Sequence, residues 1–261
     1  MERPLVMGVV NVTPDSFSDG GRYLDHDAAI AHGRALVAAG ADVVDVGGES
    51  TRPGADPVPV ADEIERVLPV VAALAPIVRV SIDTRKAEVA AAAVAAGSTL
   101  VNDVSATLHE VAAATGAGWV AMHMQGDPRT MQRDPRYGDV VDDVRSFLVE
   151  RAETAVAAGV EEVWIDPGIG FGKTVAHNLE LLARLGELVA TGFPVLLGTS
   201  RKRFLGVLLA GADGVEGPVV PDDRIEGSLA TAVWGYAAGA RMVRAHDVAA
   251  TVAAATAIAR L

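Results

Sequence analysis

Two carboxylates, a carboxamide and an ammonium group stand where chemistry could take place, because each follows a short apolar run of the chain. Asp83, Asn102 and Asp166 lie at the ends of three such runs, and Lys202 lies beyond a fourth. A carboxylate that faces adjacent N–H donors accepts two parallel hydrogen bonds, as it does from arginine. These residues therefore suit a flat nitrogen heterocycle. They could instead be metal ligands, although a divalent-cation cage is expected to use closer carboxylate spacing.

A second group of candidate residues is cationic and begins at Ser200. The segment Ser200-Arg-Lys-Arg-Phe204 follows the apolar run 194–197 and opens a helical run, 204–210. A helix start offers free N–H groups and the positive end of the helix dipole to an anion, and three successive cations add charge. The segment is thus predicted to bind an anion. The simpler interpretation is a solvated basic surface.

Arg244 and His246 lie at the end of the last apolar run, residues 242–245. They are two residues apart, as are Ser81 and Asp83, so each pair is predicted to share one face of its strand and to look into the same interior. A buried arginine needs a counter-anion, because burying its charge alone is very costly. Arg244 is therefore predicted to bind an anionic ligand, or else to form a structural ion pair with a carboxylate of the sheet.

The glycine-rich segment Asp166-Pro-Gly-Ile-Gly-Phe-Gly-Lys-Thr174 invites comparison with a phosphate-binding loop. In that motif four residues separate the first glycine from Gly-Lys-Ser/Thr, and here Pro167 occupies the place of the first glycine. The glycine spacing also differs from that of a dinucleotide-binding loop. Two interpretations stay open: a flexible connector, or a loop that packs its backbone against a flat ligand beside Asp166. No Ser-His-Asp triad, zinc-binding helix or obvious covalent nucleophile is present.

The elements that must position these residues alternate along the chain. Apolar, β-branched runs predict buried parallel strands at residues 5–10, 43–46, 77–82, 99–104, 119–122, 162–165, 194–197 and 242–245. Alanine-rich segments with helical spacing predict helices at residues 28–39, 61–75, 85–96, 140–158, 178–190, 204–210, 228–238 and 248–261. A glycine follows several of these helices, as expected of a helix end, at Gly40, Gly97, Gly116, Gly159, Gly192 and Gly239. Eight strands alternating with helices favour a single (β/α)8 TIM barrel over residues 1–261 rather than a doubly wound sheet.

The polar residues fall at the C-terminal ends of the predicted strands. Asn11, Glu49 and His123 end further strands in the same way. The C-terminal strand ends form the active face of such a barrel. Once the barrel closes, Arg244 and His246 are expected to lie beside Asn11.

The composition limits the classes of function. The 261-residue chain is 50% hydrophobic, has no cysteine and has a formal net charge of −12. The absence of cysteine excludes disulfides, zinc–thiolate sites and thiol nucleophiles, and is compatible with the cytoplasm. The negative charge argues against nonspecific binding to nucleic acid or to anionic membranes, and no apolar run approaches the roughly 20 residues of a membrane span. We therefore expect a cytoplasmic protein whose anionic ligands meet a local cluster of positive charge.

After the apolar run 5–10 the chain changes abruptly to the polar segment Asn11-Val-Thr-Pro-Asp-Ser-Phe-Ser-Asp-Gly-Gly21. Together with Asp45-Val-Gly-Gly-Glu-Ser-Thr-Arg-Pro-Gly54 and Ser200-Arg-Lys202, this segment resembles the dihydropteroate synthase family and is specific to that enzyme among pterin-binding barrels. Further motifs resemble the same family in its order: Ser81-Ile-Asp-Thr84, Asn102-Asp-Val-Ser105, Met122-His-Met-Gln-Gly126, the glycine-rich segment 166–173 and Arg244-Ala-His-Asp247. The similarity spans nearly the whole chain.

The resemblance implies condensation of 6-hydroxymethyl-7,8-dihydropterin diphosphate with 4-aminobenzoate, which yields 7,8-dihydropteroate and diphosphate in folate biosynthesis. It implies that the pterin is held by Asp83, Asn102, Asp166 and Lys202, in a slot lined by Met122, Phe171 and Gly198. Diphosphate would be bound by Asn11 through Mg²⁺, and by Arg244 and His246. The aminobenzoate would lie among Thr51, Arg52, Pro53, Phe171, Ser200, Arg201, Lys202 and Arg203. The resemblance also suggests a homodimer.

Departure of diphosphate leaves a cation at the pterin methylene, so catalysis is expected to be mainly electrostatic. An aromatic amine is neutral at pH 7, and no strong general base is required. Asn11 is expected on a rigid strand end, whereas residues 13–21 are expected to form a mobile loop that closes and excludes water. The predicted catalytic residues are Asp19, Asp83, Lys202, Arg244 and His246.

One departure from the family pattern follows Ser105, where glycine and an acidic segment are expected and the chain has Ala-Thr-Leu-His-Glu-Val. The conformation of this fourth loop is therefore open. A pterin-dependent methyltransferase could share the pocket, but it has no use for the Thr-Pro-Asp-Ser-Phe segment or for Ser200-Arg-Lys202. A non-catalytic pterin-binding paralogue would be favoured by loss of Asn11, Lys202 or Arg244, and all three are present.

Overall fold

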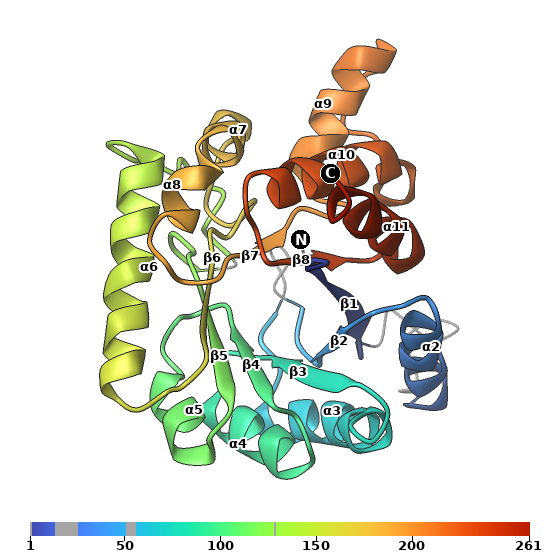
Figure 1. Ribbon diagram of the computed structural model, residues 1–261, viewed down its shortest axis with the longest axis vertical. Coiled ribbons are helices and arrows are strands. Elements are labelled where there is room, and N and C mark those ends of the chain that lie inside the picture. The colour runs from blue at the N-terminus through green and yellow to red at the C-terminus, as the bar shows by residue number, and fades with distance from the viewer. Residues whose placement is uncertain (1, 14–25, 51–55, 128) are drawn as a thin grey trace.

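The computed structural model describes residues 2–13, 26–50, 56–127 and 129–261. Within these residues, eight parallel strands form one sheet in the order β6-β5-β4-β3-β2-β1-β8-β7, with helices around it (Figure 1). The strands are β1 (Leu5–Asn11), β2 (Val43–Gly47), β3 (Arg79–Asp83), β4 (Leu100–Asp103), β5 (Gly118–Met122), β6 (Val163–Asp166), β7 (Leu196–Gly198) and β8 (Met242–Ala245). Each predicted strand is present, and the predicted (β/α)8 barrel is confirmed.

The sheet closes on itself between β6 and β7. Ile165 and Val195 form an isolated parallel bridge, and the backbone N–H of Ile165 donates to the carbonyl oxygen of Pro194 at 3.0 Å. On the other side of the sheet, β1 pairs with β8 and places Gly8 opposite Ala245. The C-terminal ends of the first and last strands therefore lie side by side, as the sequence predicted.

The interior of the barrel changes from apolar to polar along the strands. The apolar layer is one buried cluster, formed by Met7, Val43, Leu100, Val120, Trp164, Leu196 and Met242. Two residues further along five of these strands, the same inward-facing positions hold Asp45, Asn102, Met122, Asp166 and Arg244. The apolar layer is thus a floor below a mainly polar mouth, and this boundary sets the depth of any site.

The helices pack their apolar faces on the outer side of the strands, in a second and larger core. They are α2 (His26–Ala38), α3 (Val60–Leu74), α4 (Ala87–Ala95), α5 (His109–Thr115), α6 (Val140–Ala157), α7 (Val175–Ala183), α8 (Leu185–Val189), α9 (Arg203–Asp213), α10 (Ile225–Ala237) and α11 (Val248–Ile258), with a 3-10 turn η1 (Pro221–Asp223). The six glycines predicted at helix ends have φ between 72° and 114°, the region that favours glycine. In the described part of the chain, none of the helices could cross a membrane.

The structure differs from the predicted helices at two places. The seven-residue helix α5 was not predicted, because so short a segment shows little periodicity. The predicted helix 178–190 is divided into α7 and α8 at Arg184, whose φ of −107° interrupts the helix. The Arg184 guanidinium forms ion pairs with Asp139, Glu180 and Glu187. Only one of these partners lies outside the predicted helix, so the break depends partly on a contact that local sequence does not reveal.

The loop after β4, whose conformation the sequence left open, is organised by the buried Asp103. Its carboxylate accepts hydrogen bonds of 2.7 to 2.9 Å from three backbone N–H groups of the loop, those of Ser105, Thr107 and Leu108. It also accepts a hydrogen bond of 3.2 Å from the Trp119 indole. Ala106 has φ of 53°, in the left-handed region, at the position where glycine was expected. The loop therefore has a left-handed residue at Ala106 although that residue is not glycine.

At the N-terminal ends of the strands, an ion pair joins Arg79 at the start of β3 to Glu162 just before β6. Arg79 donates from Nη1 and Nη2 to the two carboxylate oxygens of Glu162, at 2.9 and 2.6 Å. The Trp164 indole donates to the same carboxylate at 2.7 Å. Burial acts to raise the pKa of Glu162, but the hydrogen bonds from Arg79 and Trp164 and the charge of Arg79 lower it overall.

We predict that Glu162→Gln lowers the free energy of unfolding at pH 7 by about 1 kcal/mol, the upper range for a partly exposed ion pair. Because the folded-state pKa of Glu162 lies below its ordinary value of 4.5, this stabilisation is complete above 4.5 and is lost as pH falls through the folded-state value. Urea unfolding of the wild-type protein and of Glu162→Gln should show a difference in the free energy of unfolding at pH 7 that becomes smaller toward about pH 3. An equal difference at both pH values would contradict the assignment.

Candidate active site

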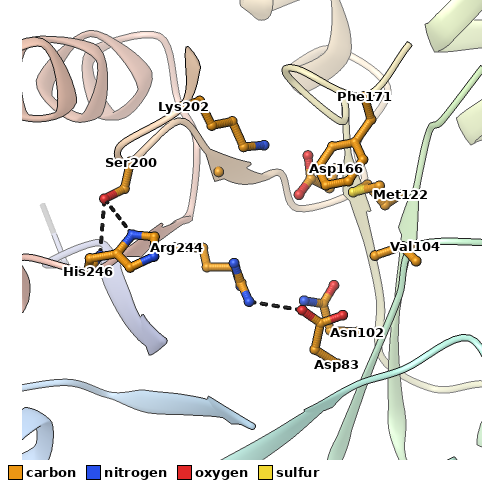
Figure 2. Close-up of a pocket in the computed structure, with 11 residues that line it drawn as sticks. Asp83, Asn102, Val104, Met122, Asp166, Phe171, Ser200, Lys202, Arg244 and His246 are labelled. Atoms are coloured by element: carbon orange, nitrogen blue, oxygen red, sulfur yellow. Dashed lines mark hydrogen bonds and ion pairs between the residues drawn. The ribbon is translucent and has the colours of Figure 1, made fainter. Parts of the chain in front are cut away.

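A pocket opens at the polar end of the barrel, where the strands have their C-terminal ends (Figure 2). It is lined by Asp83, Asn102, Val104, Met122, Asp166, Phe171, Gly198, Ser200, Lys202, Arg244 and His246. Ten of these residues were predicted as site residues from the sequence. Val104 was not, because a valine at a strand end gives no chemical signal.

The other predicted site residues lie outside this pocket or outside the described part of the chain. Asn11 ends β1, and Arg201 and Arg203 lie at the start of α9; none of them lines the pocket. The structure does not describe Asp19, Thr51, Arg52, Pro53 or most of the predicted mobile loop 13–21. The roles of these residues stay predictions.

Arg244 joins β8 to β2 and β3 in one wall of the pocket. Its Nε donates to Asp45 Oδ2 at 2.6 Å, and its Nη2 donates to Asp83 Oδ2 at 2.9 Å. Figure 2 shows the guanidinium extended toward Asp83. The Asn102 side chain also donates to Asp45 Oδ2, at 3.0 Å. Arg244 thus forms the ion pair that the sequence left open as one alternative, and it lines the pocket at the same time.

Asp45 is a part of this arrangement that sequence reasoning missed. It is fully buried on β2, opposite Ser81 on β3. Its motif was recognised, but its side chain was assigned no role because it lies within an apolar strand. A carboxylate at a position that strand parity directs inward was the available signal, since a buried charge requires a partner.

Two carboxylates share one guanidinium in this part of the pocket. Burial, together with the charge of Asp45, raises the pKa of Asp83 to about 7, against the opposing effect of Arg244. Burial acts to lower the pKa of Arg244, but the two carboxylates raise it overall. The Oδ1 atoms of Asp45 and Asp83 are buried without a hydrogen-bond partner among the described residues. These two carboxylates therefore keep acceptor capacity that the described residues do not use.

Asp166 and Lys202 form the wall across the pocket. Asp166 Oδ1 accepts a hydrogen bond from the Gly168 N–H at 2.7 Å. The Lys202 ammonium donates to the carbonyl oxygen of Ile169 and lies 4.7 Å from the centre of the Phe171 ring. Burial lowers the pKa of Lys202 to about 8, against the opposing charge of Asp166. Burial likewise raises the pKa of Asp166, against the charge of Lys202.

Gly198 leaves the space between these walls open. A Cβ atom at this position would lie 3.7 Å from Lys202 Nζ, 3.8 Å from Asp166 Oδ2 and 3.9 Å from Arg244 Cβ. Met122 and Phe171 supply apolar surface beside that space. The result is a slot with apolar sides and a few convergent polar groups, a combination typical of sites for small heterocycles.

Ser200 and His246 are hydrogen-bonded to each other at the edge of the pocket (Figure 2). Ser200 Oγ lies 3.0 Å from His246 Nδ1 and accepts a hydrogen bond from the His246 backbone N–H at 3.1 Å. When the hydroxyl donates its single proton to Nδ1, the imidazole proton must be on Nε2. In that tautomer His246 has a hydrogen-bond donor at Nε2.

The predicted cationic segment is only partly directed at the pocket. The Arg201 guanidinium donates to Asp247 at 2.8 and 3.2 Å and to Asp222 at 2.6 Å. Arg203 is exposed. Of the three successive cations, Lys202 alone lines the pocket.

The glycine-rich loop after β6 packs against the loop after β5. A Cβ atom at Gly168 would lie 1.8 Å from the carbonyl oxygen of His123, and one at Gly172 would lie 2.4 Å from that of Gln125. Both glycines also have positive φ, of 64° and 62°. These two glycines therefore permit close packing between protein loops, while Phe171, between them, lines the pocket. The structure combines features of both interpretations that the sequence left open.

Comparison with known proteins agrees with this geometry. Residues 7–246 match the pterin binding enzyme family. A dihydropteroate synthase from Mycobacterium leprae (strain TN) is 51% identical over 257 residues, which cover 95% of this chain and 89% of the relative.

Solved structures give the same result. The Xanthomonas albilineans dihydropteroate synthase with 4-aminobenzoic acid has a TM-score of 0.90 and 47% identity, covering 99% of this chain and 93% of that chain. The enzyme from the same organism in complex with 7,8-dihydropteroate has a TM-score of 0.86 and 44% identity, covering 99% of this chain and 94% of that chain. With identity of this level over nearly its whole length, the chain belongs to the dihydropteroate synthases, transferases of folate biosynthesis within the pterin binding enzyme family.

Proposed function

We propose that this pocket joins 6-hydroxymethyl-7,8-dihydropterin diphosphate to 4-aminobenzoate, forming 7,8-dihydropteroate and releasing diphosphate. The observation that supports this most is the pairing of two sets of groups in one pocket. Asp83, Asn102 and Asp166 can read the N–H edge of a flat heterocycle, and Arg244 and His246 offer donors to an anion beside it. The comparisons favour neither a methyltransferase nor a non-catalytic paralogue.

The proposed reaction is tested with the purified protein, both substrates and Mg²⁺, followed for dihydropteroate. We expect product that depends on both substrates. A folded protein that binds the pterin diphosphate and forms no dihydropteroate would contradict the proposal.

In the proposed complex, Asp166 and Asn102 bind the polar edge of the pterin, and Lys202 donates to an acceptor atom of the ring. Phe171 and Met122 supply apolar contact beside the ring. The polar groups in this slot already have defined positions, because Asn102 donates to Asp45 on β2 and Asp166 accepts from the Gly168 N–H of the loop that follows it. Little reorganisation would be needed on binding, which favours affinity.

In the proposed reaction, the bond between the pterin methylene and the diphosphate oxygen breaks, and its electron pair leaves with diphosphate. The methylene cation is delocalised into the ring, and the amine nitrogen of 4-aminobenzoate then bonds to it and loses a proton. Arg244 and His246 Nε2–H stabilise the negative charge that builds up on the leaving group. The carboxylate of Asp83 lies near the cation and stabilises it. These residues act by charge, which fits a pocket without a covalent nucleophile.

We also propose that Asn11 binds Mg²⁺. Within the described residues, no three His, Asp or Glu side chains are grouped to hold a metal ion. Mg²⁺ does not require such a group, because it commonly keeps several waters and binds substrate phosphates through few protein ligands. Asn11 pairs in register with Gly47, and Gly47 with Asp83, so its carboxamide stands at the level of the pocket. Asn11 would supply one oxygen, and the ion would neutralise diphosphate charge.

The remaining parts of the proposal concern 4-aminobenzoate and the assembly. We place the aminobenzoate among Thr51, Arg52, Pro53, Phe171 and the segment Ser200-Arg-Lys-Arg203, with Asp19 on a loop that closes over the site. Support comes from Ser200, Lys202 and Phe171, which line the pocket next to the start of α9. We further propose that the protein is a cytoplasmic homodimer. We also propose that it does not bind nucleic acid, because its net charge of −12 would repel a polyanion.

We predict that Asp166→Asn reduces kcat/KM for the pterin substrate by about 10⁴-fold, because an unpaired polar group at a recognition edge costs that much in discrimination. The substitution keeps the shape of the side chain and removes its charge. Asp213→Asn is the control, because Asp213 is an exposed carboxylate on α9. Near-normal kcat/KM in Asp166→Asn would refute the assignment of the pterin edge.

We predict that Arg244→Met weakens binding of inorganic diphosphate and lowers the free energy of unfolding by about 3 kcal/mol, because it leaves two buried carboxylates without their shared cation. Calorimetry with Mg²⁺ and diphosphate, and urea unfolding, measure the two effects. Arg241→Met is the matched control, since Arg241 is exposed and lies at a distance of 3.6 Å from Glu2. Unchanged diphosphate affinity in folded Arg244→Met would contradict the role of Arg244.

A further inference from the structure

The chain has nineteen arginines and only three lysines, and all three lysines lie near the C-terminal ends of the strands. Lys202 lines the pocket, and Lys86 forms ion pairs with Glu49 and Glu63. The third, Lys173, ends the glycine-rich loop after β6 and has no part in the proposed reaction. An ammonium differs from a guanidinium because all three of its N–H donors lie on one nitrogen atom. A buried ammonium where the chain otherwise uses arginine calls for a physical reason.

Lys173 is only 3% exposed, and its ammonium is surrounded by acceptors. Nζ lies 2.9 Å from His123 Nδ1, 3.0 Å from the carbonyl oxygen of Gly168 and 3.0 Å from that of Phe171. A longer contact of 3.4 Å joins it to the carbonyl oxygen of His123. Three short contacts satisfy the three donors of an ammonium. Lys173 does not line the pocket, so any effect on the ligand must pass through other residues.

The charges around Lys173 define the state of its partners. Burial, with the charge of Lys173, lowers the pKa of His123 to about 3, so this imidazole is neutral. Nδ1 is the acceptor when the Lys173 ammonium donates to it. Burial also lowers the pKa of Lys173 to about 7, with Asp166 opposing this effect and Lys202 adding to it. The centre of the Tyr137 ring lies 6.0 Å from Nζ.

The hydrogen bonds of Lys173 fix the stretch of loop that holds Lys202. Gly168 and Phe171 accept from Lys173, and between them lies Ile169, whose carbonyl oxygen accepts from Lys202. The Phe171 ring is also the ring beneath the Lys202 ammonium. Without Lys173, the carbonyl groups of this loop would lose a shared donor inside the protein, which is unfavourable.

We propose that Lys173 is a positioning residue, which holds Ile169 and Phe171 in place against Lys202 and so sets the width and polarity of the slot. Lys173 joins this stretch of the loop after β6 to His123 at the end of β5. The effect of Lys173 on ligand binding rests on the proposed function, in which the slot binds a pterin. The position of Lys202 itself can be measured without any ligand.

The three lysines make a direct measurement practical. Protein labelled with ¹³C at the lysine ε position gives signals from three side chains, assigned by substituting each lysine in turn. The Lys202 signal reports the position of the Phe171 ring, because an aromatic ring shifts the signals of nearby atoms. The Lys86 signal reports correct folding at a site away from the loop. The test variant is Lys173→Met, which keeps the length of the side chain and removes every donor.

We expect the Lys202 signal of ligand-free Lys173→Met to move toward that of an unstacked lysine, with the Lys86 signal unchanged. We also expect the Kd for 6-hydroxymethylpterin, measured by calorimetry, to rise about tenfold or more, as when a residue that supports a binding group is removed. Lys86→Gln is the matched control. It also removes a largely buried ammonium, and it should lower the midpoint of thermal unfolding without changing the Lys202 signal or the Kd.

An unchanged Lys202 signal and an unchanged Kd in folded Lys173→Met would overturn the inference and leave the proposed function intact. Wild-type protein that fails to bind 6-hydroxymethylpterin would instead contradict the proposed function. If Lys173→Met does not fold, His123→Leu makes the test, because it removes one of the three acceptors and keeps Lys173. It should shift the Lys202 signal in the same direction, and no shift would overturn the inference.

Discussion

The structure of the site depends on one buried charge, the guanidinium of Arg244. An arginine inside a barrel requires anions within reach, and Asp45 and Asp83 supply them from two other strands. Burial, together with the charge of Asp45, raises the pKa of Asp83 even though Arg244 opposes this effect. The same contacts therefore close the polar layer of the barrel and leave a wall able to accept hydrogen bonds. Stability and binding use the same groups here, and neither can be altered alone.

The second wall is built differently: Asp166 ends β6, but Phe171 and Lys202 belong to the segments that follow β6 and β7. Gly168 and Gly172 allow the loop after β6 to approach the backbone after β5, where any side chain would collide with a carbonyl oxygen. The approach brings Phe171 to the pocket and the Ile169 carbonyl to Lys202. A rigid wall on β2, β3 and β8 thus faces a wall that depends on loop packing. This difference explains why a residue outside the pocket, Lys173, can influence its shape.

Much of this architecture could be predicted from the sequence. Strand parity correctly directed Asp83, Arg244 and His246 toward one pocket, because alternation is a local property of a strand. Strand parity could also have directed Asp45 inward, but its partner Arg244 lies 199 positions away, and no local pattern links the two residues. The same limit applies to Arg201, whose contacts with Asp222 and Asp247 turn it away from the pocket. Predicting which side chains pair across the barrel requires knowledge of the fold. Predicting the direction of a side chain requires only the position of its residue in the strand.

In the proposed function, one pocket binds the pterin at Asp166 and the diphosphate at Arg244. A crystal structure of the protein with 6-hydroxymethylpterin, diphosphate and Mg²⁺ tests it most directly. We expect the pterin ring in the slot beside Gly198, with its N–H edge on the Asp166 carboxylate, and diphosphate in contact with Arg244 and His246. A pterin bound elsewhere, or bound in this slot without a hydrogen bond to Asp166, would contradict it.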